Sequence, residues 1–420
     1  MNLTLDQQNA LEQLGVFLLS EDPIMVIKGY AGTGKSTMIK AFMDDLENTE
    51  IGLKLIDPSY VPRTILMCAP THKAVDVLRT LFLGSSPKPL FTTQSLFGMR
   101  LERQPNGTSK MVHSPRNVKF REHSLIIVDE ASYIDGQLLS VISQCALDTK
   151  SKVVFMGDPA QLTPVESAQS PVFCAGFPEA VLTEIVRQDP SSKLQQMIAD
   201  YRNSVSTGVL PSITVAPPEI HFVDDKDEAQ QLLREEFCSG NWHPGASRVL
   251  AWTNQRVVAY NEWLEKQITG TPEFKVGQYY ICNSGVTINQ KLLPASSEVL
   301  IVEAIERGAV QLGVPGDWLG LSTSTHGIVR VFAPTDFVAW QAALRNWRKV
   351  EDFQSIAQAS AWVDLRNLYA STVNKAQGST YDKVFIDLKD ISACRSRTQR
   401  ARLMYVAASR ARKEVVLFSF

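Results

Sequence analysis

Residues 29–36, GYAGTGKS, constrain the possible folds of this chain more than any other stretch. They follow a short apolar run, PIMVI, and precede TMIKAFMDDL, which has the pattern of a helix. Glycines at this spacing let backbone N–H groups turn inward and surround phosphate oxygens at the N-terminus of a helix. The segment therefore predicts a buried strand, a phosphate-binding loop and a helix that begins near Lys35.

The side chains of this loop supply further contacts that a nucleoside triphosphate needs. Lys35 is expected to reach the β- and γ-phosphates, and the hydroxyl of Ser36 is expected to bind Mg²⁺. The nucleotide-binding residues predicted in this segment are Gly29, Gly32, Thr33, Gly34, Lys35, Ser36 and Thr37. Kinases, transporters, switches and motors share such a loop, so the reaction has to be inferred from other segments.

Three further apolar runs, TILMCAP, SLIIVDE and SKVVFMGD, indicate strands that are joined by helical segments. Strands that are buried on both faces and connected through helices imply a parallel sheet, in which ligands gather at the carboxyl ends of the strands. Gly29, Pro70, Asp129 and Asp158 all fall at such ends. We therefore expect an α/β fold with a nucleotide at one edge of a parallel sheet.

An acidic pair, Asp129 and Glu130, ends one of these strands. Asp129 is expected to help Ser36 hold Mg²⁺, and Glu130 is expected to orient and deprotonate an attacking water. Many strands end in acids, so the pair gains its weight from following a phosphate loop. A small-molecule kinase needs an acceptor pocket rather than a water-activating acid, and hydrolysis is therefore favoured.

Three more side chains are candidates for contact with the γ-phosphate. Gln161, in GDPAQL, is a neutral hydrogen-bond donor. Arg187, in LTEIVRQ, and Arg410, in LMYVAASRARK, carry guanidinium groups, which stabilise a transferring phosphoryl group by roughly 10³–10⁵ in rate. Both arginines lie outside the first sheet, so we predict that a nucleotide between two domains is hydrolysed with side chains from each. The other arginines of CRSRTQRARLMYVAASRARK fit the solvated face of a helix.

The alternation of strands and helices is interrupted twice. Residues 97–119 contain Asn106-Gly107, a strong hairpin-turn signal. Residues 276–364 contain short β-like runs and then a helical stretch whose tryptophans have the spacing of core residues. With a boundary near Asp189-Pro190, we predict a first domain at 1–96 and 120–189, a β-hairpin insertion at 97–119, a second domain at 190–275 and 365–420, and a β-barrel-like and helical insertion at 276–364.

Bulk properties exclude several classes of protein. The net charge of −2 argues against a chain coated in positive charge, although it allows a local basic groove. There is no apolar run long enough to span a membrane, and the N-terminus lacks a secretion signal. The six cysteines have no metal-ligand spacing and are expected to be reduced thiols. These properties are typical of a cytoplasmic enzyme.

The same residues form an ordered set of motifs along nearly the whole chain: LTLDQQNA, GYAGTGKS, APTHKA, VDEAS, GDPAQL, VRQ, STVNKAQGST and LMYVAASRAR. This set resembles that of superfamily 1 DNA helicases, and most closely their RecD/Dda-like branch, which moves 5′ to 3′. The resemblance implies two RecA-like parallel-sheet domains. It also implies a β-hairpin pin inserted in the first domain and an SH3-like barrel with helices inserted in the second.

The resemblance assigns further roles to individual residues. Gln7 matches the glutamine that reads adenine, and Gly378 is assigned to nucleotide binding. The residues that match a motif in contact with the backbone of single-stranded DNA are Pro70, Thr71, His72 and Lys73. The residues at the position of the strand-separating pin are Arg103, Pro105, Asn106 and Gly107. The family usually has histidine at Asn374 and often at Gln94, so the coupling of DNA to ATP is expected to be tuned differently in this chain.

Single strands are commonly held by polar groups directed at the backbone and by aromatic side chains that stack on bases. The further DNA-binding candidates in this chain are Thr92, Thr93, Ser95, Phe97, Asn254, Thr372, Asn374 and Lys375.

The expected function is that of a monomeric, ATP- and Mg²⁺-dependent helicase that translocates 5′ to 3′ on single-stranded DNA and unwinds duplexes. Its expected partners are single-stranded and forked duplex DNA, with a single-strand DNA-binding protein as a further candidate, in the cytoplasm of a bacterial or phage-infected cell. Two alternatives stay open. One is a DNA-stimulated ATPase that translocates but unwinds weakly, and the other is a phosphate-loop nucleotide enzyme that is not a motor.

Overall fold

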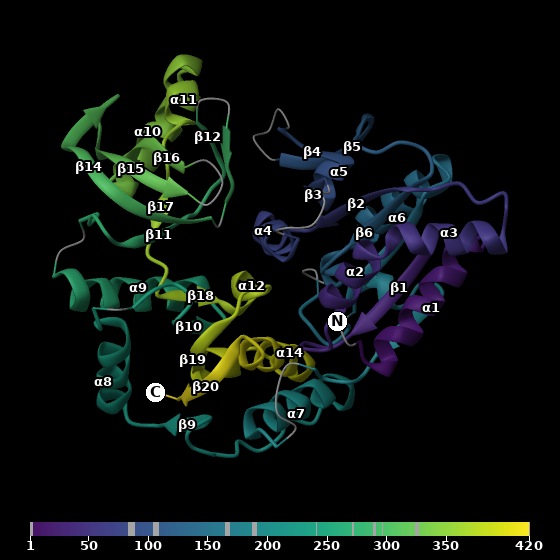
Figure 1. Ribbon diagram of the computed structural model, residues 1–420. Coiled ribbons are helices and arrows are strands. Elements are labelled where there is room, and N and C mark those ends of the chain that lie inside the picture. Colours follow the sequence, from purple (N-terminus) through teal and green to yellow (C-terminus); the bar gives the residue numbers. More distant parts are fainter. Residues whose placement is uncertain are drawn as a thin grey trace. The chain divides into compact units, whose positions relative to one another are not determined.

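A computed structural model of the chain describes residues 3–82, 89–103, 109–163, 169–186, 191–240, 242–270, 273–288, 291–295, 297–323 and 327–419. The chain forms two compact units (Figure 1). Unit 1 comprises residues 1–211 and 397–406, and unit 2 comprises residues 212–396 and 407–420. The chain first passes from unit 1 to unit 2 after Pro211, which is later in the sequence than the boundary expected near Asp189-Pro190. Helix α7 (Lys193–Thr207) therefore belongs to unit 1, where the guanidinium of Arg202 lies 4.1 Å from the centroid of the Tyr30 ring.

Unit 1 is built on a six-stranded sheet in which every neighbouring pair is parallel. The strand order is β3-β2-β6-β7-β1-β8. The strands are β1 (Ile24–Gly29), β2 (Thr64–Ala69), β3 (Leu90–Thr92), β6 (Ser124–Val128), β7 (Lys152–Gly157) and β8 (Glu179–Leu182). The four apolar runs that predicted strands are β1, β2, β6 and β7, so the predicted parallel α/β sheet is confirmed.

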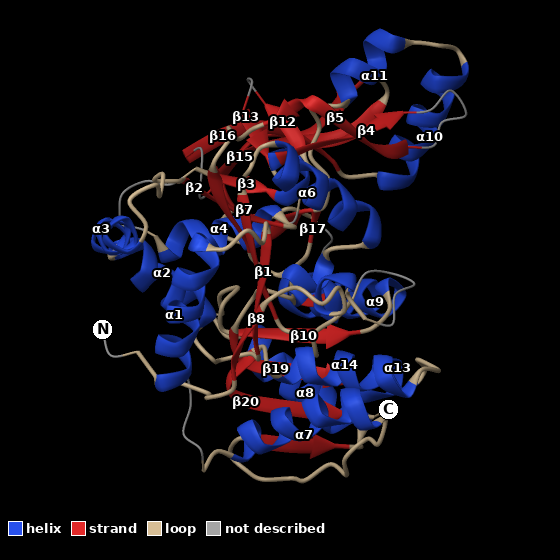
Figure 2. Cartoon of the chain, turned by 90° about the vertical axis from the view of Figure 1, so that its right-hand side faces the viewer, coloured by secondary structure: helices blue, strands red, loops and turns tan. Residues whose placement is uncertain are grey.

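Helices cover both faces of this sheet, because its strands are apolar on both sides. In β1, Met25 and Ile27 belong to one core cluster, whereas Ile24 and Val26 belong to another. Figure 2 shows α1, α2 and α3 on one side of the strands and α6 on the other. The helices that contribute to the two clusters are α1 (Leu5–Leu19), α2 (Lys35–Asp44), α3 (Leu46–Ile56) and α4 (His72–Leu81) in one, and α5 (Thr93–Leu96) and α6 (Gly136–Asp148) in the other. Each fully buried side chain of this kind stabilises the fold by about 1.5–3 kcal/mol.

The first helix begins where its sequence predicts. Thr4 is the N-cap of α1, and a capping box joins it to Gln7. Such a box satisfies two backbone N–H groups that the first turn would otherwise leave without partners. One residue earlier than Gln7, the Asp6 carboxylate accepts hydrogen bonds from the Thr183 hydroxyl and backbone, at 2.6 and 2.8 Å. The start of α1 is thereby attached to the chain that follows β8.

The hairpin insertion expected at residues 97–119 stays a prediction, and the structure describes two strands within it. Strands β4 (Phe97–Arg103) and β5 (Ser109–Val118) pair antiparallel, with Leu101 opposite Met111. Gly98 has φ of +67°, and a Cβ on it would lie 2.5 Å from the carbonyl oxygen of Ser114. The irregularity between Phe97 and Met99 therefore depends on glycine. A short helix, α5 (Thr93–Leu96), precedes the hairpin.

Unit 2 contains a second all-parallel sheet, with strand order β18-β10-β19-β20-β9. Its strands are β9 (Ile220–Val223), β10 (Ser247–Ala251), β18 (Ala370–Thr372), β19 (Tyr381–Asp387) and β20 (Ala411–Phe418). Val249, Phe385 and Phe418 pack with residues of α8 (Lys226–Phe237) and α9 (Asn254–Thr269). Helices α12 (Val373–Ala376) and α13 (Leu388–Ser392) also belong to this unit, whereas α14 (Arg397–Ala408) belongs to unit 1 up to Val406.

Between β10 and β18, unit 2 carries an antiparallel sheet of order β16-β15-β14-β11-β17. Its strands are β11 (Tyr279–Cys282), β14 (Glu298–Gln311), β15 (Val314–Thr323), β16 (Gly327–Pro334) and β17 (Leu365–Arg366), and a small hairpin pairs β12 (Val286–Ile288) with β13 (Lys291–Leu293). With α10 (Phe337–Lys349) and α11 (Phe353–Ala359), this region buries Trp340, Trp347 and Trp362 in one cluster, as their spacing predicts. The SH3-like assignment stays a prediction.

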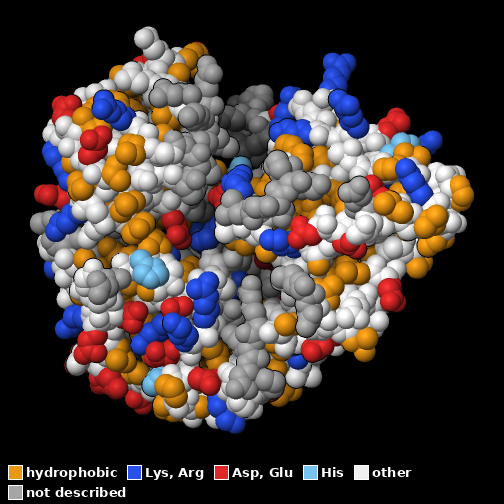
Figure 3. Space-filling model, viewed as in Figure 1, with side chains coloured by type: hydrophobic (Ala, Val, Ile, Leu, Met, Phe, Trp, Pro, Cys, Tyr) orange, Lys and Arg blue, Asp and Glu red, His pale blue; other side chains and the backbone are white. Residues whose placement is uncertain are grey.

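Two whole-chain expectations can be compared with the structure. All six cysteines are free thiols, as expected. Within the part of the chain that the structure describes, no helix combines the length and apolar character that crossing a membrane demands. On the face shown in Figure 3, basic and acidic side chains are interspersed, in keeping with a net charge of −2.

Candidate functional site

The predicted site residues of unit 1 gather at one edge of its sheet. Because all six strands are parallel, the ends of β1, β2, β6 and β7 lie at the same edge. Gly29, Pro70, Asp129 and Asp158 stand at or directly after these ends. The structure therefore brings the phosphate loop, the acidic pair and the GDPAQL segment together, as expected for a parallel sheet.

The backbone of the phosphate loop requires glycine at two places. Gly34, the N-cap of α2, has φ of +75°, and a Cβ on it would lie 2.5 Å from Nε2 of Gln7. A Cβ on Gly29 would lie 2.7 Å from Oγ1 of Thr33. A side chain at either position would force a neighbouring side chain to shift, whereas glycine leaves room for the loop backbone to surround phosphate oxygens at the start of α2.

Lys35 is the first residue of α2, and its side chain turns back over the loop. Its Nζ donates hydrogen bonds to the carbonyl oxygens of Gly29, at 2.5 Å, and Tyr30, at 3.1 Å. The ammonium is therefore held against the loop that is expected to bind phosphate. The contact of Lys35 with the β- and γ-phosphates stays a prediction.

Gln7 is buried, and both atoms of its amide have protein partners. Oε1 accepts from the backbone N–H of Thr4 at 3.1 Å, and Nε2 donates to the carbonyl oxygen of Thr33 at 3.0 Å. Gln7 thus attaches α1 to the phosphate loop. Its predicted reading of adenine stays a prediction, and Nε2 has a second N–H and Oε1 a second lone pair with which to make such a contact.

Asp129 and Glu130 follow β6. Burial raises the pKa of the Asp129 carboxyl, while the backbone N–H of Glu130, 2.9 Å from Oδ1, and the charge of Lys35 act in the opposite direction. Glu130 has φ of +53° and ψ of +44°, the left-handed region. A non-glycine residue held there stores on the order of 1–3 kcal/mol of strain, and such strain is frequent at active sites.

The donors near the loop suit Mg²⁺ rather than a softer metal. The Ser36 hydroxyl and the Asp129 carboxylate are hard oxygen ligands, and Mg²⁺ is commonly held by one or two such groups together with phosphates and water. Among the residues that the structure describes, no group of three or more His, Cys, Asp or Glu side chains is arranged to hold a metal ion. The side chains present therefore fit Mg²⁺ that arrives with a nucleotide.

A buried hydrogen-bond network of unit 1 was not predicted from the sequence. The Asp158 carboxylate accepts from the backbone N–H groups of Ala31, at 3.1 Å, and Ala160, at 2.9 Å, and from the hydroxyl of Tyr405. Arg402 donates to the carbonyl oxygens of Pro159, at 2.7 Å, and Gln161. The sequence signal was present, because these residues lie in GDPAQL and LMYVAASRAR, but their mutual contact was not visible in it.

The basic C-terminal stretch is therefore only partly a solvated helix face. Arg402 is 3% exposed and Arg410 is 6% exposed. Arg402 does not belong to a solvated face, because backbone carbonyl oxygens of unit 1 accept hydrogen bonds from its guanidinium.

The structure describes two of the three residues that are predicted to contact the γ-phosphate, Gln161 and Arg410. Gln161 is buried close to Asp158, whose carbonyl oxygen accepts from the Gln161 backbone N–H at 3.2 Å. Arg187 lies outside the described residues, but Val186 directly before it donates its N–H to the carbonyl oxygen of Gly32 at 3.0 Å. Arg410 belongs to unit 2, where it donates to the carbonyl oxygen of Ser379 at 3.2 Å. The roles of both arginines stay predictions.

The motif APTHKA lies where β2 ends and α4 begins. Thr71 is the N-cap of α4, and its side chain accepts from the backbone N–H of Ala74 at 3.2 Å. His72 is partly buried, and desolvation lowers the pKa of its imidazole. Pro70 and Thr71 thus connect the carboxyl end of β2 to α4, and His72 and Lys73 are the first residues of that helix. The contact of these four residues with DNA stays a prediction.

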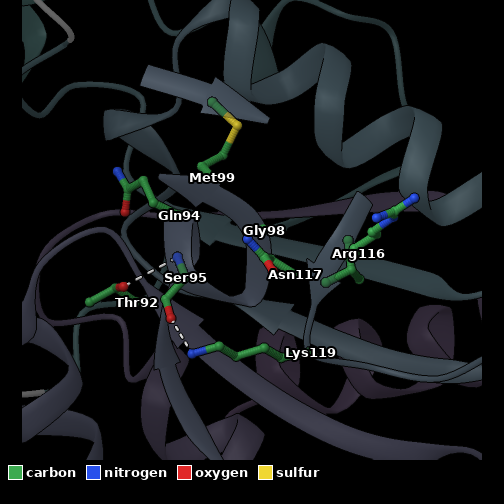
Figure 4. Close-up of a pocket in the computed structure, with 9 residues that line it drawn as sticks. Thr92, Gln94, Ser95, Gly98, Met99, Arg116, Asn117 and Lys119 are labelled. Atoms are coloured by element: carbon green, nitrogen blue, oxygen red, sulfur yellow. Dashed lines mark hydrogen bonds between the residues drawn. The ribbon is translucent and has the colours of Figure 1, made fainter. Parts of the chain in front are cut away.

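A pocket of about 510 Å³ lies at the base of the hairpin (Figure 4). The Lys119 ammonium donates to the hydroxyl of Ser95 at 2.6 Å, and the Thr92 hydroxyl accepts from the Ser95 backbone at 3.4 Å. The residues that line it are Thr92, Gln94, Ser95, Gly98, Met99, Arg116, Asn117, Val118 and Lys119. Two of the predicted DNA-binding residues lie here, together with two cations, Arg116 and Lys119, which the sequence did not single out.

Two of the DNA-binding candidates need correction. Thr93 and Phe97 are both 0% exposed. Phe97 packs in the core of unit 1 and makes an edge-to-face contact with Phe120, with ring centroids 5.3 Å apart. Neither side chain reaches the surface in this conformation, so neither can stack on a base or bind a phosphate from solution.

The candidates of unit 2 lie at one edge of its sheet. Strands β10 and β18 are parallel neighbours, with Ala251 opposite Thr372. Asn254 and Asn374 are exposed just beyond these strands, whereas Thr372 is buried and caps α12. Lys375 is also exposed, and its Nζ donates to Oδ1 of Asn283 at 3.4 Å.

Gly378 has φ of +79°, which favours glycine at this position.

Of the predicted pin residues, Pro105, Asn106 and Gly107 lie outside the described residues, and Arg103 is the last residue of β4.

Comparisons with known proteins place this geometry in a family. Residues 2–209 match the model of an AAA domain, and residues 367–418 match a UvrD-like helicase C-terminal domain. The ATP-dependent DNA helicase Dda of Enterobacteria phage T4 is 24% identical over 462 residues, which cover 99% of this chain and 98% of that protein. The chain is a superfamily 1 helicase of the RecD and Dda type.

Other relatives of this helicase have similar or shorter matches. An uncharacterised protein, R530, of Acanthamoeba polyphaga mimivirus is 22% identical over 92% of this chain and 94% of its own length. The RecD subunit of the RecBCD enzyme of Buchnera aphidicola is 28% identical over 42% of this chain and 29% of its own length. A solved structure of Pif1 helicases superimposes with a TM-score of 0.56 and 18% identity, and it covers 99% of this chain and 92% of that one. At this level of identity the structural likeness concerns the fold.

Proposed function

We propose that this helicase is an ATP-driven motor that translocates 5′ to 3′ along single-stranded DNA and unwinds duplex DNA. The observation that carries the proposal is the edge of the sheet in unit 1. A glycine-dependent phosphate loop, a lysine held over it, the acidic pair and the buried Gln161 all lie there. The direction of movement rests on the likeness to RecD and Dda.

Each residue at this edge has a task in hydrolysis. Loop N–H groups and Lys35 bind the phosphates, and Ser36 and Asp129 hold Mg²⁺, which when bound neutralises charge on the phosphates. Glu130 orients the attacking water and takes up its proton. Gln161, Arg187 and Arg410 contact the γ-phosphate, and the two guanidinium groups stabilise charge in the transition state.

The strand-end residues of both units hold single-stranded DNA in this proposal. The groups with exposed or partly exposed side chains are Pro70 to Lys73, Thr92 and Ser95 in unit 1, and Asn254, Asn374 and Lys375 in unit 2. Arg116 and Lys119 add positive charge for phosphates at the base of the hairpin, and the hairpin keeps the separated strands apart. The helicase acts as a monomer in the cytoplasm on single-stranded and forked DNA, with a single-strand DNA-binding protein as a further partner.

The decisive experiment measures unwinding of duplexes that carry either a 5′ or a 3′ single-stranded tail. We expect ATP-dependent unwinding of the 5′-tailed duplex only. Unwinding that needs a 3′ tail refutes the direction. Translocation without unwinding of either substrate identifies the weakly unwinding translocase, and ATP hydrolysis that DNA does not stimulate identifies a nucleotide enzyme that is not a motor.

The Lys35→Ala variant serves as the control for contaminating activity. Loss of the ammonium removes the main charge opposite the β- and γ-phosphates, so hydrolysis and unwinding are expected to disappear while binding of single-stranded DNA persists. Residual unwinding by this variant would show that another enzyme in the preparation is responsible.

A further inference from the structure

The backbone N–H of Ala31, in the phosphate loop, is shared between two buried oxygen atoms. It lies 3.1 Å from Oδ2 of Asp158 and 3.0 Å from the hydroxyl oxygen of Tyr405. The Tyr405 hydroxyl in turn donates to the Asp158 carboxylate. Asp158 is 1% exposed and Tyr405 is 0% exposed, so water does not compete for these bonds. The loop is therefore bonded directly to a side chain of α14.

The same helix is bonded to the segment that carries Gln161. Arg402 stands one turn before Tyr405 on α14, and its guanidinium donates to the carbonyl oxygens of Pro159 and Gln161. Residues three apart on a helix lie on the same face. One face of α14 thus contacts both the loop that surrounds phosphates and the segment that is proposed to contact the γ-phosphate.

The chain continues from this helix directly to Arg410. Unit 1 includes α14 up to Val406, and unit 2 resumes at Ala407. Helix α14 ends at Ala408, and Arg410 follows two residues later. A helix is a stiff element with a rise of about 1.5 Å per residue. A displacement of Tyr405 is therefore passed along a short and mostly helical stretch to the segment that bears Arg410.

We propose that Tyr405 is a positioning residue that couples the phosphate loop to Arg410. When phosphates bind or leave the loop, the N–H of Ala31 moves, and the Tyr405 hydroxyl carries that movement into α14. Asp158 holds the hydroxyl and the loop in register. This inference rests on the proposed function, because it requires Arg410 to act on the nucleotide.

The test removes only the hydroxyl, in Tyr405→Phe. Its matched control is Tyr260→Phe, because the Tyr260 hydroxyl is also buried and donates to a buried aspartate, Asp387, at 2.8 Å, within unit 2. With saturating single-stranded oligonucleotide, we expect the kcat for ATP of Tyr405→Phe to fall about fivefold to tenfold, with KM changed less than about threefold. The control is expected to keep its kcat within about twofold, and both variants are expected to lose a similar part of their thermal stability.

A double-mutant cycle with Arg410→Ala separates the inference from the function on which it rests. If Tyr405 acts through Arg410, then Tyr405→Phe lowers kcat in the wild-type background but has no further effect when Arg410 is alanine. If Tyr405→Phe lowers kcat by the same factor in the Arg410→Ala background as in the wild type, the inference is overturned. It is also overturned if the Tyr405→Phe single variant has the kcat of the wild type. A wild-type kcat of Arg410→Ala instead overturns the proposed role of Arg410. Equal loss of kcat in the Tyr260→Phe control shows a general stability effect and also overturns the inference.

Discussion

Replacement of Gly34 by alanine tests the conformation of the phosphate loop. Gly34 has φ of +75°, and an alanine Cβ would lie 2.5 Å from Nε2 of Gln7. The left-handed conformation costs a non-glycine residue about 1–2 kcal/mol. The Gln7 side chain must also move, which breaks its 3.0 Å hydrogen bond to the carbonyl oxygen of Thr33 and costs about 1 kcal/mol. The expected loss in free energy of unfolding is therefore about 2–3 kcal/mol.

The loss should be visible in stability and in nucleotide binding. Chemical unfolding, monitored by tryptophan fluorescence, measures the free energy of unfolding. Titration with a fluorescent ATP analogue measures the affinity for nucleotide. If the protein relieves the strain by opening the loop, part of the 2–3 kcal/mol appears as weaker binding, at tenfold for each 1.4 kcal/mol. The structure predicts about 2–3 kcal/mol for the sum of the loss in free energy of unfolding and the loss in free energy of nucleotide binding.

Gly15 provides the matched control in the same unit. It lies inside α1, and a Cβ on it would have no neighbour within 4 Å. Gly15→Ala is therefore expected to stabilise the protein by roughly 0.5–1 kcal/mol without an effect on ATP binding. If Gly34→Ala matches wild type in both measurements, the loop does not have this backbone conformation, and the reasoning is refuted.

Three further outcomes are expected. Glu130→Gln should bind ATP with nearly unchanged affinity but hydrolyse it at least about a hundredfold more slowly, because the amide cannot take a proton from water; a single-turnover assay with normal hydrolysis would contradict this. Deletion of residues 104–109, which removes the segment between β4 and β5 and the first residue of β5, should abolish unwinding while ATP-driven translocation persists. Unchanged unwinding in a forked-duplex assay would contradict the assignment of the hairpin as a pin. The double variant Arg116→Ala, Lys119→Ala should bind single-stranded DNA more weakly, and the slope of its log binding constant against log salt concentration should be smaller by about 0.7 for each phosphate that it no longer neutralises. Lys54→Ala, at an exposed position of α3, is the control. An equal slope in the wild type and both variants would exclude this pocket as a DNA-binding site.

Local patterns predicted most strands of the parallel sheets and supplied the candidate nucleotide-binding residues. A phosphate loop is a contiguous segment, and its glycines, its lysine and the flanking strand and helix can all be read within a few residues of one another. Asp129 and Asp158 were found because the carboxyl ends of parallel strands meet at one edge, whatever the order of the strands. The hairpin was predicted from its turn, since Asn-Gly favours the backbone conformation that tight hairpins need.

Burial was predicted less well, because it depends on what packs against an element from elsewhere in the chain. Thr93 and Phe97 stand close to the partly exposed Thr92 and Ser95 in sequence, yet both lie wholly inside unit 1. The direction of each side chain follows from how α5 and the hairpin pack on the sheet. Arg402 is polar and lies in a basic stretch, yet its guanidinium is buried because backbone carbonyl oxygens from the distant GDPAQL segment accept its hydrogen bonds.

The order of residues along this chain was enough to establish two parallel α/β sheets, a phosphate loop with its acidic pair, and the set of motifs that marks a helicase. Those features follow from local backbone preferences and from side-chain chemistry within single segments. The tertiary fold alone decided that Tyr405 and Asp158 share the N–H of Ala31, that α14 divides between the two units, and that cations line the base of the hairpin. Contacts between residues hundreds of positions apart depend on how whole elements pack, and no local pattern records that packing.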